Sequence, residues 1–436
     1  MKLAGRHALV LGAGRSGRAA ATLLRRSGAR VCIYDRDAAA LDELGELGGN
    51  IEVVTGDEAP SIDAFDCAVA SPGIPVLPHP KLLPEVDLAA IFLRAPLVGV
   101  TGTNGKSTTT LLIAEMLRAS GKSVAVGGNI GTPLCSLVDA EVDVVVAELS
   151  SFQLEYAQRL TAHVAVLLNL AADHLDRHGD LAHYGAAKER LAALQGPDDF
   201  LVTNADDAWA SAVAKRSVAH QRRFGVQPHA GRSAFCDADA VVFRAEPDSG
   251  PDLRVPLPTL SPSCRHPIAN SLAAGTAALR AGATFAGVSG ALQQFAGLEH
   301  RHRLIATRSG VQYIDDSKAT NPAAAAASLQ GQTRPVWWLA GGRNKNLDFG
   351  PLAGAVERVR EALLFGEARE ELAAALGDSV AVQLFPDLDQ AVAYAAERAA
   401  PGEVVLLSPA CASFDQFASF EARGVHFARV VRDLPC

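Results

Sequence analysis

Three features that mark common classes of protein are missing from this sequence of 436 residues. The chain has no excess of positive charge, because 40 basic and 48 acidic side chains leave a net charge of −8. No overall positive field therefore attracts nucleic acid or anionic lipid. The chain also has no run of 18 or more apolar residues, which a membrane-spanning helix needs. We expect neither nucleic acid nor a membrane among its partners.

The cysteines are few and lack the C-x-x-C spacing of metal sites and redox motifs. Seven occur in the chain, and an odd, scattered set in a chain of this length argues against a disulfide framework. The first residues, MKLAGRHALVLGAG, are broken by glycines and differ from a signal peptide. We therefore expect a cytoplasmic protein, and we expect a monomer. The cysteines are Cys32, Cys67, Cys135, Cys236, Cys264, Cys411 and Cys436.

What is present indicates a globular α/β protein of about three domains. Hydrophobic residues make up 49% of the chain and charged residues 20%, and strand-like runs alternate with helix-like ones. The rhythm restarts near residue 94 and again near 298. We predict a Rossmann-like domain at 1–93, a central P-loop ATPase domain at 94–298 and a Rossmann-like domain at 299–436. Short polar and Pro-rich stretches at about 215–262 predict a small β-rich insertion in the central domain.

The segment GAGRSG at residues 12–17 matches G-x-G-x-x-G between a strand and a helix. Its glycines would let a phosphate approach backbone N–H groups at a helix N-terminus. Asp35 ends the next strand, at the spacing of a carboxylate that binds ribose. A tight turn that binds no dinucleotide would explain the same residues, so the motif predicts a nearby phosphate more firmly than NAD.

The segment TGTNGKST at residues 101–108 gives the stronger prediction of a phosphate site. Backbone N–H groups and Lys106 would cradle the β- and γ-phosphates of a nucleotide, and Ser107 would ligate Mg²⁺. The spacing departs from G-x-x-x-x-G-K-[ST], because Val100 stands where the first glycine is expected. A chance Gly- and Thr-rich loop is the alternative, but a strand and a helix flank this loop as the mechanism requires.

Polar groups follow the loop at the ends of later strands. Asn129 lies in a glycine turn, Glu148 ends an apolar strand, and His174 lies among carboxylates. Each has an ordinary reading: Glu148 as a surface acid, His174 as the first residue of a helix and Lys188 as a solvated helix lysine. Because such groups meet at the carboxyl edge of a parallel sheet, their succession predicts a crevice for ATP and metal.

Together these motifs resemble the Mur ligases of peptidoglycan synthesis, over essentially the whole chain. The motifs are TGTNGKST, GGNIG, ELSSFQLE, DHLD, AAK, EHR, DDSKATNP and SPACASFDQF. The last motif, with the following FEARG, resembles the D-glutamate-adding branch, whereas the phosphate loop and the His-Arg pair also occur in folylpolyglutamate synthase. The resemblance implies an ATP-dependent amide ligase that joins D-glutamate to UDP-N-acetylmuramoyl-L-alanine through an acyl phosphate. It implies ATP and Mg²⁺, with two Mg²⁺ sites.

The resemblance also implies roles for individual residues. Those implied in catalysis are Lys106, Glu148, His174 and Lys188, the last as a carbamate formed with CO₂. Those implied to ligate metal are Ser107, Glu148, His174 and Lys188. Those implied to bind ATP are Gly102, Thr103, Asn104, Gly105, Lys106, Ser107, Thr108, Asn270, His300, Arg301, Asp316 and Lys318. Those implied to bind the other substrates are Ser16, Asp35, Arg36, Ser71, Asn129, Ser150, Thr320, Lys345, Ser413 and Phe420.

Three positions depart from the family pattern. His266-Pro267 replaces a His-Asn pair before the adenine site, Arg303 replaces an acid after EHR, and Arg343 replaces a frequent aspartate. Other readings stay open: a sister ligase that adds another amino acid, a dehydrogenase or a P-loop regulatory switch. A dehydrogenase leaves TGTNGKST and Glu148 without a role, and a switch leaves the first domain and SPACAS unexplained.

Overall fold

The computed structural model describes residues 3–42, 51–75, 79–245, 251–265 and 267–434. Two residues named above, His266 and Cys436, lie outside the described residues. The chain forms two compact units. The first comprises Met1–Leu170, Ala182–Pro256 and Leu272–Leu292. The second comprises Ala171–Leu181, Leu257–Ser271 and Gln293–Cys436.

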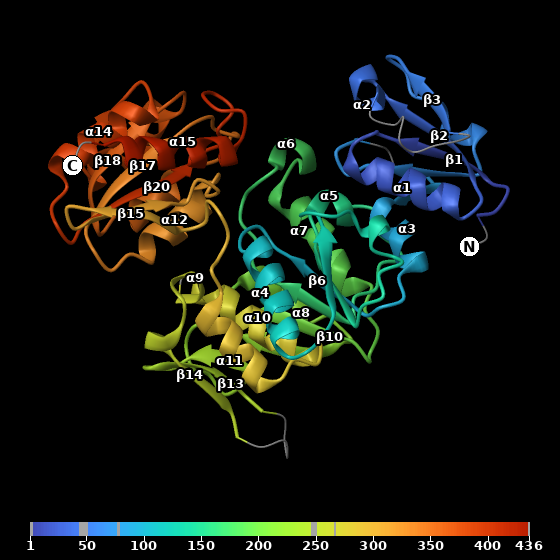
Figure 1. Ribbon diagram of the computed structural model, residues 1–436, viewed down its shortest axis with the longest axis horizontal. Coiled ribbons are helices and arrows are strands. Elements are labelled where there is room, and N and C mark those ends of the chain that lie inside the picture. Colours follow the sequence, from blue (N-terminus) through green and yellow to red (C-terminus); the bar gives the residue numbers. More distant parts are fainter. Residues whose placement is uncertain (1–2, 43–50, 76–78, 246–250, 266, 435–436) are drawn as a thin grey trace. The chain divides into compact units, whose positions relative to one another are not determined.

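A parallel five-stranded sheet begins the first unit (Figure 1). Its spatial order is β3 (Ile51–Thr55), β2 (Arg30–Asp35), β1 (His7–Leu11), β4 (Cys67–Ala70) and β5 (Leu82–Pro84). Its helices are α1 (Arg15–Arg26), α2 (Ala38–Asp42), the 3-10 turn η2 (Ile62–Ala64) and α3 (Glu85–Phe92). The short edge strands β3 and β5 lack the buried apolar run of β1 and β2, so the sequence alone gives little sign of them.

A nine-stranded sheet forms the centre of the first unit. Its spatial order is β14 (Leu253–Pro256), β13 (Ala240–Phe243), β12 (Ala234–Cys236), β11 (His220–Phe224), β10 (Phe200–Asn204), β9 (Val164–Leu167), β6 (Leu97–Thr101), β8 (Val144–Glu148) and β7 (Val124–Gly128). The six strands from β11 to β7 are parallel, β12 pairs parallel to β11, and β13 runs antiparallel to its neighbours β12 and β14. The predicted β-rich segment therefore extends the edge of this sheet.

Helices connect these strands along the chain. They are α4 (Lys106–Ala119), η3 (Leu134–Ser136), α5 (Ser151–Leu154), α6 (Leu175–His178), α7 (Leu181–Ala193), α8 (Ala208–Ala214), η4 (Leu257–Thr259), α9 (Pro262–Arg265), α10 (Ile268–Arg280) and α11 (Phe285–Gln294). Strand β6 is buried along its whole length, between β8 and β9. The loop that follows β6 therefore opens at the carboxyl edge of the sheet, where open α/β sheets bind ligands.

Helix α3 fastens the two sheets of the first unit together. The buried carboxylate of Asp87 accepts backbone N–H bonds from Gln158, Arg159 and Leu160 at 2.7 to 3.0 Å. Glu85 is also buried and accepts the N–H of Cys135 at 2.7 Å. These bonds satisfy backbone donors that would otherwise be buried without partners.

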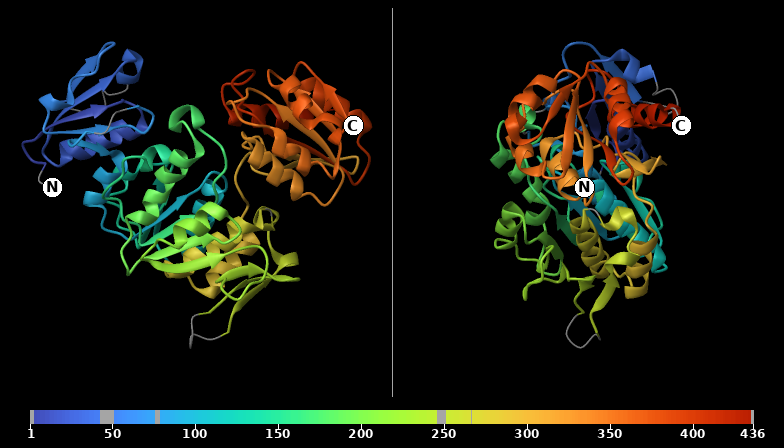
Figure 2. Two further views of the ribbon diagram at one scale, coloured as in Figure 1. Left: turned by 180° about the vertical axis from the view of Figure 1, so that it is seen from behind. Right: turned by 90° about the vertical axis from the view of Figure 1, so that its left-hand side faces the viewer.

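The second unit contains a six-stranded sheet (Figure 2, left). Its spatial order is β15 (Arg303–Arg308), β16 (Val311–Asp315), β20 (Val404–Ala410), β17 (Val336–Gly341), β18 (Val359–Phe365) and β19 (Val382–Leu384). Only β15 runs antiparallel to its neighbour. The helical segments are α12 (Pro322–Gln330), η5 (Gly350–Ala355), α13 (Arg369–Leu376), η6 (Gly377–Ser379), α14 (Leu388–Arg398) and α15 (Phe420–Asp433).

Helices cover both faces of this third sheet. One core cluster joins residues of α12, η5 and α13 to alternate strand residues such as Trp338 and Leu406. A second joins α14 and α15 to the intervening residues, such as Leu339 and Leu407. Because successive strand residues point to opposite faces, the two clusters lie on opposite sides of the sheet. This is the three-layer arrangement of a Rossmann-like fold.

The alanine-rich segment at 323–328 is helical, as its composition predicts. The DDSKATNP motif supplies the start of that helix. The side chain of Asn321 accepts the N–H of Ala324 at 2.8 Å, and Pro322 occupies the first turn.

The predicted α/β fold class is confirmed. The structure has three sheets, and those at the two ends of the chain are Rossmann-like. The proposed boundaries near residues 94 and 298 stay predictions. Cys32, Cys67, Cys135, Cys236, Cys264 and Cys411 are free thiols. Among the described residues, no helix has both the length and the apolar composition needed to cross a membrane.

Candidate active site

The loop between β6 and α4 has the backbone shape that a phosphate site requires. Gly102 (φ 152°) and Gly105 (φ 87°) adopt positive φ values, which cost glycine little. A Cβ on Gly102 would lie 2.9 Å from the Cβ of Leu168, so a larger residue would displace the loop. The first turn of α4 presents N–H groups and the positive end of the helix dipole here.

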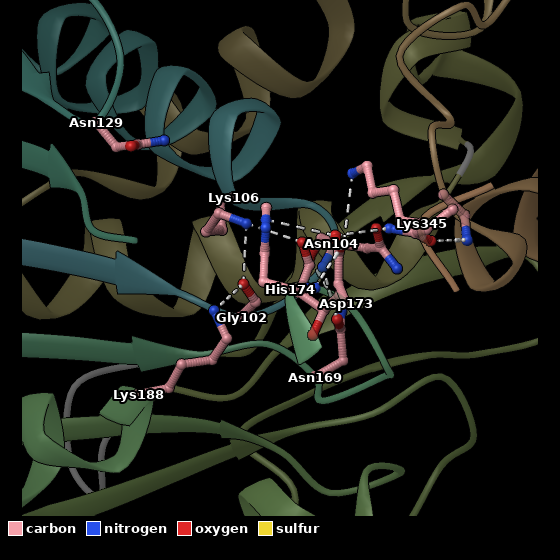
Figure 3. A network of polar contacts seen from close by, with 12 residues as sticks. Gly102, Asn104, Lys106, Asn129, Asn169, Asp173, His174, Lys188 and Lys345 are labelled. Atoms are coloured by element: carbon pink, nitrogen blue, oxygen red, sulfur yellow. Dashed lines mark hydrogen bonds and ion pairs between the residues drawn. The ribbon is translucent and has the colours of Figure 1, made fainter. Parts of the chain in front are cut away.

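Asn169, which follows β9, holds this loop in place (Figure 3). Its backbone oxygen accepts the N–H of Thr103 at 2.9 Å. Its side-chain oxygen accepts the N–H of Asn104 at 2.8 Å, and its Nδ2 donates to the Asn104 carbonyl at 3.1 Å. Asn169 was not among the predicted site residues, although an amide directly after the apolar run VAVLL is a signal that the sequence offers.

Two lysines donate hydrogen bonds to one carbonyl of the loop, as Figure 3 shows. Lys106 Nζ lies 2.9 Å from the Gly102 oxygen, and Lys188 Nζ lies 2.8 Å from the same atom. Lys106 also donates to the Thr103 carbonyl at 2.8 Å. Lys188 is 1% exposed, and its Nζ lies 4.4 Å from the centre of the Tyr184 ring. The reading of Lys188 as a solvated helix lysine is therefore wrong.

Glu148 is a buried carboxylate at the end of β8, next to the phosphate loop in the sheet. It is 2% exposed, and strand pairing sets it beside Val100 on one side and Gly128 on the other. Its Oε1 accepts a hydrogen bond from Asn129 Nδ2 at 2.7 Å. Its Oε2 is buried and has no hydrogen-bond partner. The reading of Glu148 as a surface acid is therefore wrong.

These residues fit ATP with Mg²⁺. A buried carboxylate oxygen without a hydrogen-bond partner is costly unless a ligand meets it, and Mg²⁺ prefers carboxylate oxygens. Among the described residues, no group of three or more His, Cys, Asp or Glu side chains is placed to hold a metal. Magnesium bound here would therefore take further ligands from water and phosphate oxygens, as is usual for its nucleotide complexes.

The glycine loop of the first sheet is tightly packed. Gly12 has a φ of 92°, and a Cβ on Gly17 would lie 1.8 Å from the Gly12 oxygen. Ser71 Oγ donates to the Gly12 carbonyl at 3.2 Å. Asp35 Oδ2 accepts the N–H of Ala13 at 2.7 Å, so this carboxylate holds the loop in the structure.

Two glycine loops meet within the first unit. Arg15, the first residue of α1, donates through Nη1 to the carbonyl of Gly131 at 3.2 Å. Gly131 belongs to the turn that carries Asn129, whose side chain reaches Glu148. Ser16 is half-buried in α1, whereas Arg36 is exposed.

Asp173 lies just before α6 in the second unit and contacts three polar side chains. Its Oδ1 lies 3.4 Å from Lys345 Nζ, and its Oδ2 accepts from Asn321 Nδ2 at 3.3 Å. His174 Nε2 lies 3.7 Å from Oδ2. Burial alone would raise the pKa of Asp173, but Lys345, His174 and Asn321 together hold it below its ordinary value. The sequence analysis placed Asp173 in a motif without selecting it.

Two neighbouring carboxylates lie at the end of β16 and differ in their partners: Asp315 is its last residue and Asp316 follows it. Asp315 Oδ2 lies 2.7 Å from His300 Nδ1, and this bond raises the pKa of the histidine. Asp316 accepts from the His302 N–H and from Ser408 Oγ, each at 3.2 Å. Burial raises the pKa of Asp316 to about 7. Its charge therefore changes near neutral pH.

Lys318 and Phe420, both predicted to bind ligands, lie together in the second unit. Lys318 Nζ is 4.7 Å from the centre of the Phe420 ring, a favourable cation–π distance. The Phe420 carbonyl accepts the hydroxyl of Ser317 at 2.8 Å.

Arg423 holds three strand-end loops of the second unit together. It is fully buried and donates to Ser317 Oγ at 3.0 Å and to the Ser317 carbonyl at 2.9 Å. It also donates to the carbonyls of Gly341 and Cys411 at 3.3 and 3.1 Å. These loops lead to Lys318, Lys345 and Ser413, so Arg423 fixes the frame that carries them. The sequence analysis quoted FEARG without selecting its arginine.

The departures at Arg303 and Arg343 are accommodated at the surface. Arg303 pairs with Glu299 at 2.9 Å, and Arg343 makes a bidentate pair with Glu367 at 2.9 Å. This pairing raises the pKa of Arg343 and lowers that of Glu367. Pro267 is exposed before α10, and its carbonyl accepts the N–H of Asn270 at 3.1 Å.

Some of the predicted residues make ordinary structural contacts. Ser150 caps α5 through a reciprocal pair with Gln153, which is a capping box. Thr320 is half-buried and donates its N–H to the Lys318 carbonyl at 2.8 Å. Ser413 and Asn270 are buried. The binding roles of all four stay predictions.

The predicted residues divide between the two units. The first unit brings together the phosphate loop with Lys188, and Glu148 with Asn129. The second brings Lys345 close to His174 through Asp173, Lys318 to Phe420, and His300 and Arg301 to the neighbouring carboxylates. Within the first unit, a glycine-rich phosphate loop follows a buried parallel strand, two lysines donate to one of its carbonyls, and the neighbouring strand ends in a buried carboxylate. This arrangement is typical of a P-loop enzyme of the α/β class.

Comparison with known proteins narrows this class to a family. Residues 100–278 match the family model "Mur ligase middle domain", and residues 300–411 match "Mur ligase, glutamate ligase domain". Residues 3–116 match "Alanine dehydrogenase/PNT, C-terminal domain", in agreement with a Rossmann-like sheet. The chain belongs to the Mur ligase family.

Full-length relatives carry one name within that family. The UDP-N-acetylmuramoylalanine–D-glutamate ligase of Geotalea daltonii is 39% identical, over 100% of this chain and 99% of the relative. The enzyme of the same name from Acidobacterium capsulatum is 40% identical, over 99% and 97%.

Solved structures share the fold at lower identity. A pseudomurein peptide ligase type C from Methanothermus fervidus has a TM-score of 0.63 at 17% identity, over 99% of this chain and 100% of the other. A bifunctional folylpolyglutamate synthase/dihydrofolate synthase from Yersinia pestis has a TM-score of 0.57 at 21% identity, over 80% and 92%.

Replacement of Glu148 by glutamine tests the metal role. If Oε2 meets Mg²⁺, Glu148→Gln should raise the Mg²⁺ concentration for half-maximal ATP turnover by about tenfold or more, as loss of a charged contact predicts. The melting temperature without metal should not fall, because the variant no longer buries a charge. The exposed Glu141→Gln is the matched control. An unchanged Mg²⁺ requirement in Glu148→Gln would refute the role.

The raised pKa of Asp316 predicts a pH-dependent stability. The folded protein holds this proton more tightly than the unfolded chain, so the stabilisation is fully present below about pH 4 and is lost as the pH rises through about 7. Asp316→Asn mimics the neutral form. In chemical denaturation, the free energy of unfolding of the variant minus that of wild type should rise by roughly 2 to 4 kcal/mol from pH 5 to pH 8. Exposed Asp348→Asn should show no such gain, and parallel curves for Asp316→Asn would contradict the assignment.

Proposed function

We propose that this protein is an ATP-dependent ligase that joins D-glutamate to UDP-N-acetylmuramoyl-L-alanine, with release of ADP and phosphate. The observation that carries the proposal is the set of groups at the phosphate loop. Lys106 and Lys188 donate to the same Gly102 carbonyl, and Glu148, at the end of the neighbouring strand β8, has a buried Oε2 without a hydrogen-bond partner. The names of the full-length relatives supply the substrates.

The reaction needs an activated carboxylate, because a free carboxylate would have to expel oxide. The alanyl carboxylate oxygen forms a bond to the γ-phosphorus, and the bond from that phosphorus to the β-bridging oxygen breaks. The neutral amine of D-glutamate then attacks the acyl carbon, loses a proton and displaces phosphate. Lys106 and the N–H groups of α4 bind the transferring phosphoryl group. Mg²⁺, when bound, neutralises part of the charge that develops there.

Glu148 and the Lys188 carbamate are the proposed protein ligands of Mg²⁺, with Ser107 and His174 as further ligands of the two metal sites. Asn129 orients Glu148 through its 2.7 Å hydrogen bond. The other residues of the phosphate loop, with Asn270, His300, Arg301, Asp316 and Lys318, are proposed to bind ATP.

The amino acid is proposed to bind to the second unit. Lys345, Lys318, Thr320 and Ser413 provide donors for the two carboxylates of D-glutamate, and Phe420 flanks its methylenes. Lys345 has the carboxylate of Asp173 as its partner in the structure. A carboxylate of D-glutamate would therefore replace a partner of the same charge. The first glycine loop, with Ser16, Asp35, Arg36 and Ser71, is proposed to hold the UDP part.

The proposed reaction is tested by product release. Purified protein with Mg-ATP and UDP-N-acetylmuramoyl-L-alanine should release ADP when D-glutamate is added, and L-glutamate should give a much smaller rate. Coupled ADP detection and mass analysis of the product measure both. Turnover with another amino acid in place of D-glutamate would instead identify a sister ligase. Failure with every amino acid, with ATP still bound, would reject the ligase assignment.

Lys188 is proposed to react with CO₂ and to act as a carbamate. Burial and a neighbouring ammonium group both disfavour a charged amine, and the neutral amine is the form that attacks CO₂. The resulting anion would lie between Lys106 and the bound metal, where its charge is favourable.

Removal of CO₂ should therefore abolish ligase activity, and bicarbonate should restore it. Lys188→Arg should be inactive with or without bicarbonate, because a guanidinium does not form the carbamate. Exposed Lys215→Arg serves as the control and should behave as wild type. Near-normal activity of Lys188→Arg would contradict the carbamate.

A further inference from the structure

Arg15 joins the two glycine loops of the first unit, and the roles proposed above leave it without a function. It is the first residue of α1 and lies inside the GAGRSG segment. Its side chain is exposed, and its Nη1 donates to the carbonyl of Gly131 at 3.2 Å. Because a guanidinium group has five N–H donors, Arg15 can keep this bond and bind an anion at the same time.

The turn that contains Gly131 is closed by hydrogen bonds and leads directly to Glu148. The N–H of Gly128 donates to the Thr132 carbonyl at 2.8 Å. Asn129 donates its N–H to the Glu148 carbonyl at 2.8 Å and its Nδ2 to Glu148 Oε1 at 2.7 Å. A Cβ on Gly128 would lie 2.2 Å from the Glu148 carbonyl oxygen, so the turn fits closely against this residue. A displacement of the turn would therefore move the amide that holds the Glu148 carboxylate.

The loop from which Arg15 projects is also held firmly. A Cβ on Gly17 would lie 1.8 Å from the Gly12 oxygen, so the backbone on either side of Arg15 is closely packed. The N–H of Ala13 donates to Asp35 Oδ2 at 2.7 Å. The guanidinium thus bridges two well-defined pieces of backbone, one at each glycine loop.

Other residues hold the segment that follows the turn. Glu85 Oε1 accepts the N–H of Cys135 at 2.7 Å. Arg26, the last residue of α1, pairs with Asp139 at 2.6 Å. These contacts do not involve Arg15. Removal of the Arg15 side chain would therefore release the turn without detaching the segment after it.

We propose that Arg15 is a positioning residue that couples the first glycine loop to Glu148. The proposal rests on the proposed function, in which the UDP part occupies this loop and Mg²⁺ meets Glu148. The diphosphate would bind further N–H groups of Arg15 through charge-assisted hydrogen bonds, while Nη1 stays on the Gly131 carbonyl. Arg15 then holds the turn and Glu148 more firmly, so the substrate strengthens the binding of Mg²⁺. Because coupling of this kind is reciprocal, Mg²⁺ strengthens the binding of the substrate by the same factor.

The first test needs neither metal nor ATP. Hydrogen exchange of the peptide that covers residues 127–132 is measured by mass spectrometry, with and without saturating UDP-N-acetylmuramoyl-L-alanine. In wild type, the substrate should slow this exchange by about fivefold or more, because it stabilises the closed turn. Arg15→Met keeps a long unbranched side chain but has no donors, and it should reduce the effect to less than about twofold.

The second test measures the coupling directly. The Mg²⁺ complex of a non-hydrolysable ATP analogue is titrated by calorimetry, with and without the saturating substrate. In wild type, the substrate should lower the Kd of the complex by about fivefold or more, and Arg15→Met should lose this decrease. Arg26→Met is the matched control, because Arg26 ties the same helix to the same segment away from the turn. It should keep the decrease.

Each outcome decides the proposal. Loss of both substrate effects in Arg15→Met, with retention in Arg26→Met, supports it. An equal loss in Arg26→Met would indicate a general loosening of α1 and would overturn it. Unchanged effects in Arg15→Met, or no effect in wild type that binds the substrate, would also overturn it. Failure of wild type to bind the substrate in a separate titration would instead reject the proposed function. Unchanged melting temperatures of the two variants exclude loss of folding as the cause.

Discussion

The carbonyl of Gly102 is the point on which the proposed phosphate site of the first unit depends. It accepts hydrogen bonds from Lys106 and from Lys188, two lysines that lie far apart in the sequence. The carbonyl reaches them because Gly102 has a φ that other residues rarely adopt. Two ammonium groups at one oxygen repel each other, so an anion at this place is stabilised by both. A nucleotide phosphate supplies such an anion, whereas a carbamate formed on Lys188 itself would lie beside the ammonium group of Lys106.

Two buried carboxylates, Glu148 and Asp173, differ in how their oxygens are paired. Glu148 lies at the end of the adjacent strand, and Asn129 engages only one of its oxygens. In the second unit, Asp173 is instead saturated by Lys345, Asn321 and His174. Glu148 thus has one oxygen to which a cation can bind, whereas Asp173 contacts the cationic side chains that a substrate carboxylate would use.

Short sequence patterns predicted the features that depend only on residues close together in the chain. The glycine loop between a strand and a helix, the position of Glu148 at a strand end and the alanine-rich helix all followed from a few neighbouring residues. Asn169, Asp173 and Arg423 were not selected, because their roles arise from partners distant in the chain that only the fold brings near. The ordinary readings of Lys188 and Glu148 failed for the same reason, since burial is a property of the fold. Ser150 is the opposite case: it was predicted to bind substrate, and its capping box at α5 explains its presence without a substrate.

In the proposed reaction, ATP activates the alanyl carboxylate as an acyl phosphate. The most direct measurement is the transfer of ¹⁸O from the alanyl carboxylate of UDP-N-acetylmuramoyl-L-alanine during turnover with D-glutamate. Each phosphate released should carry one labelled oxygen, because the phosphate that the amine displaces from the acyl phosphate keeps one oxygen of the substrate carboxylate. Unlabelled phosphate, formed together with the amide product, would contradict the account.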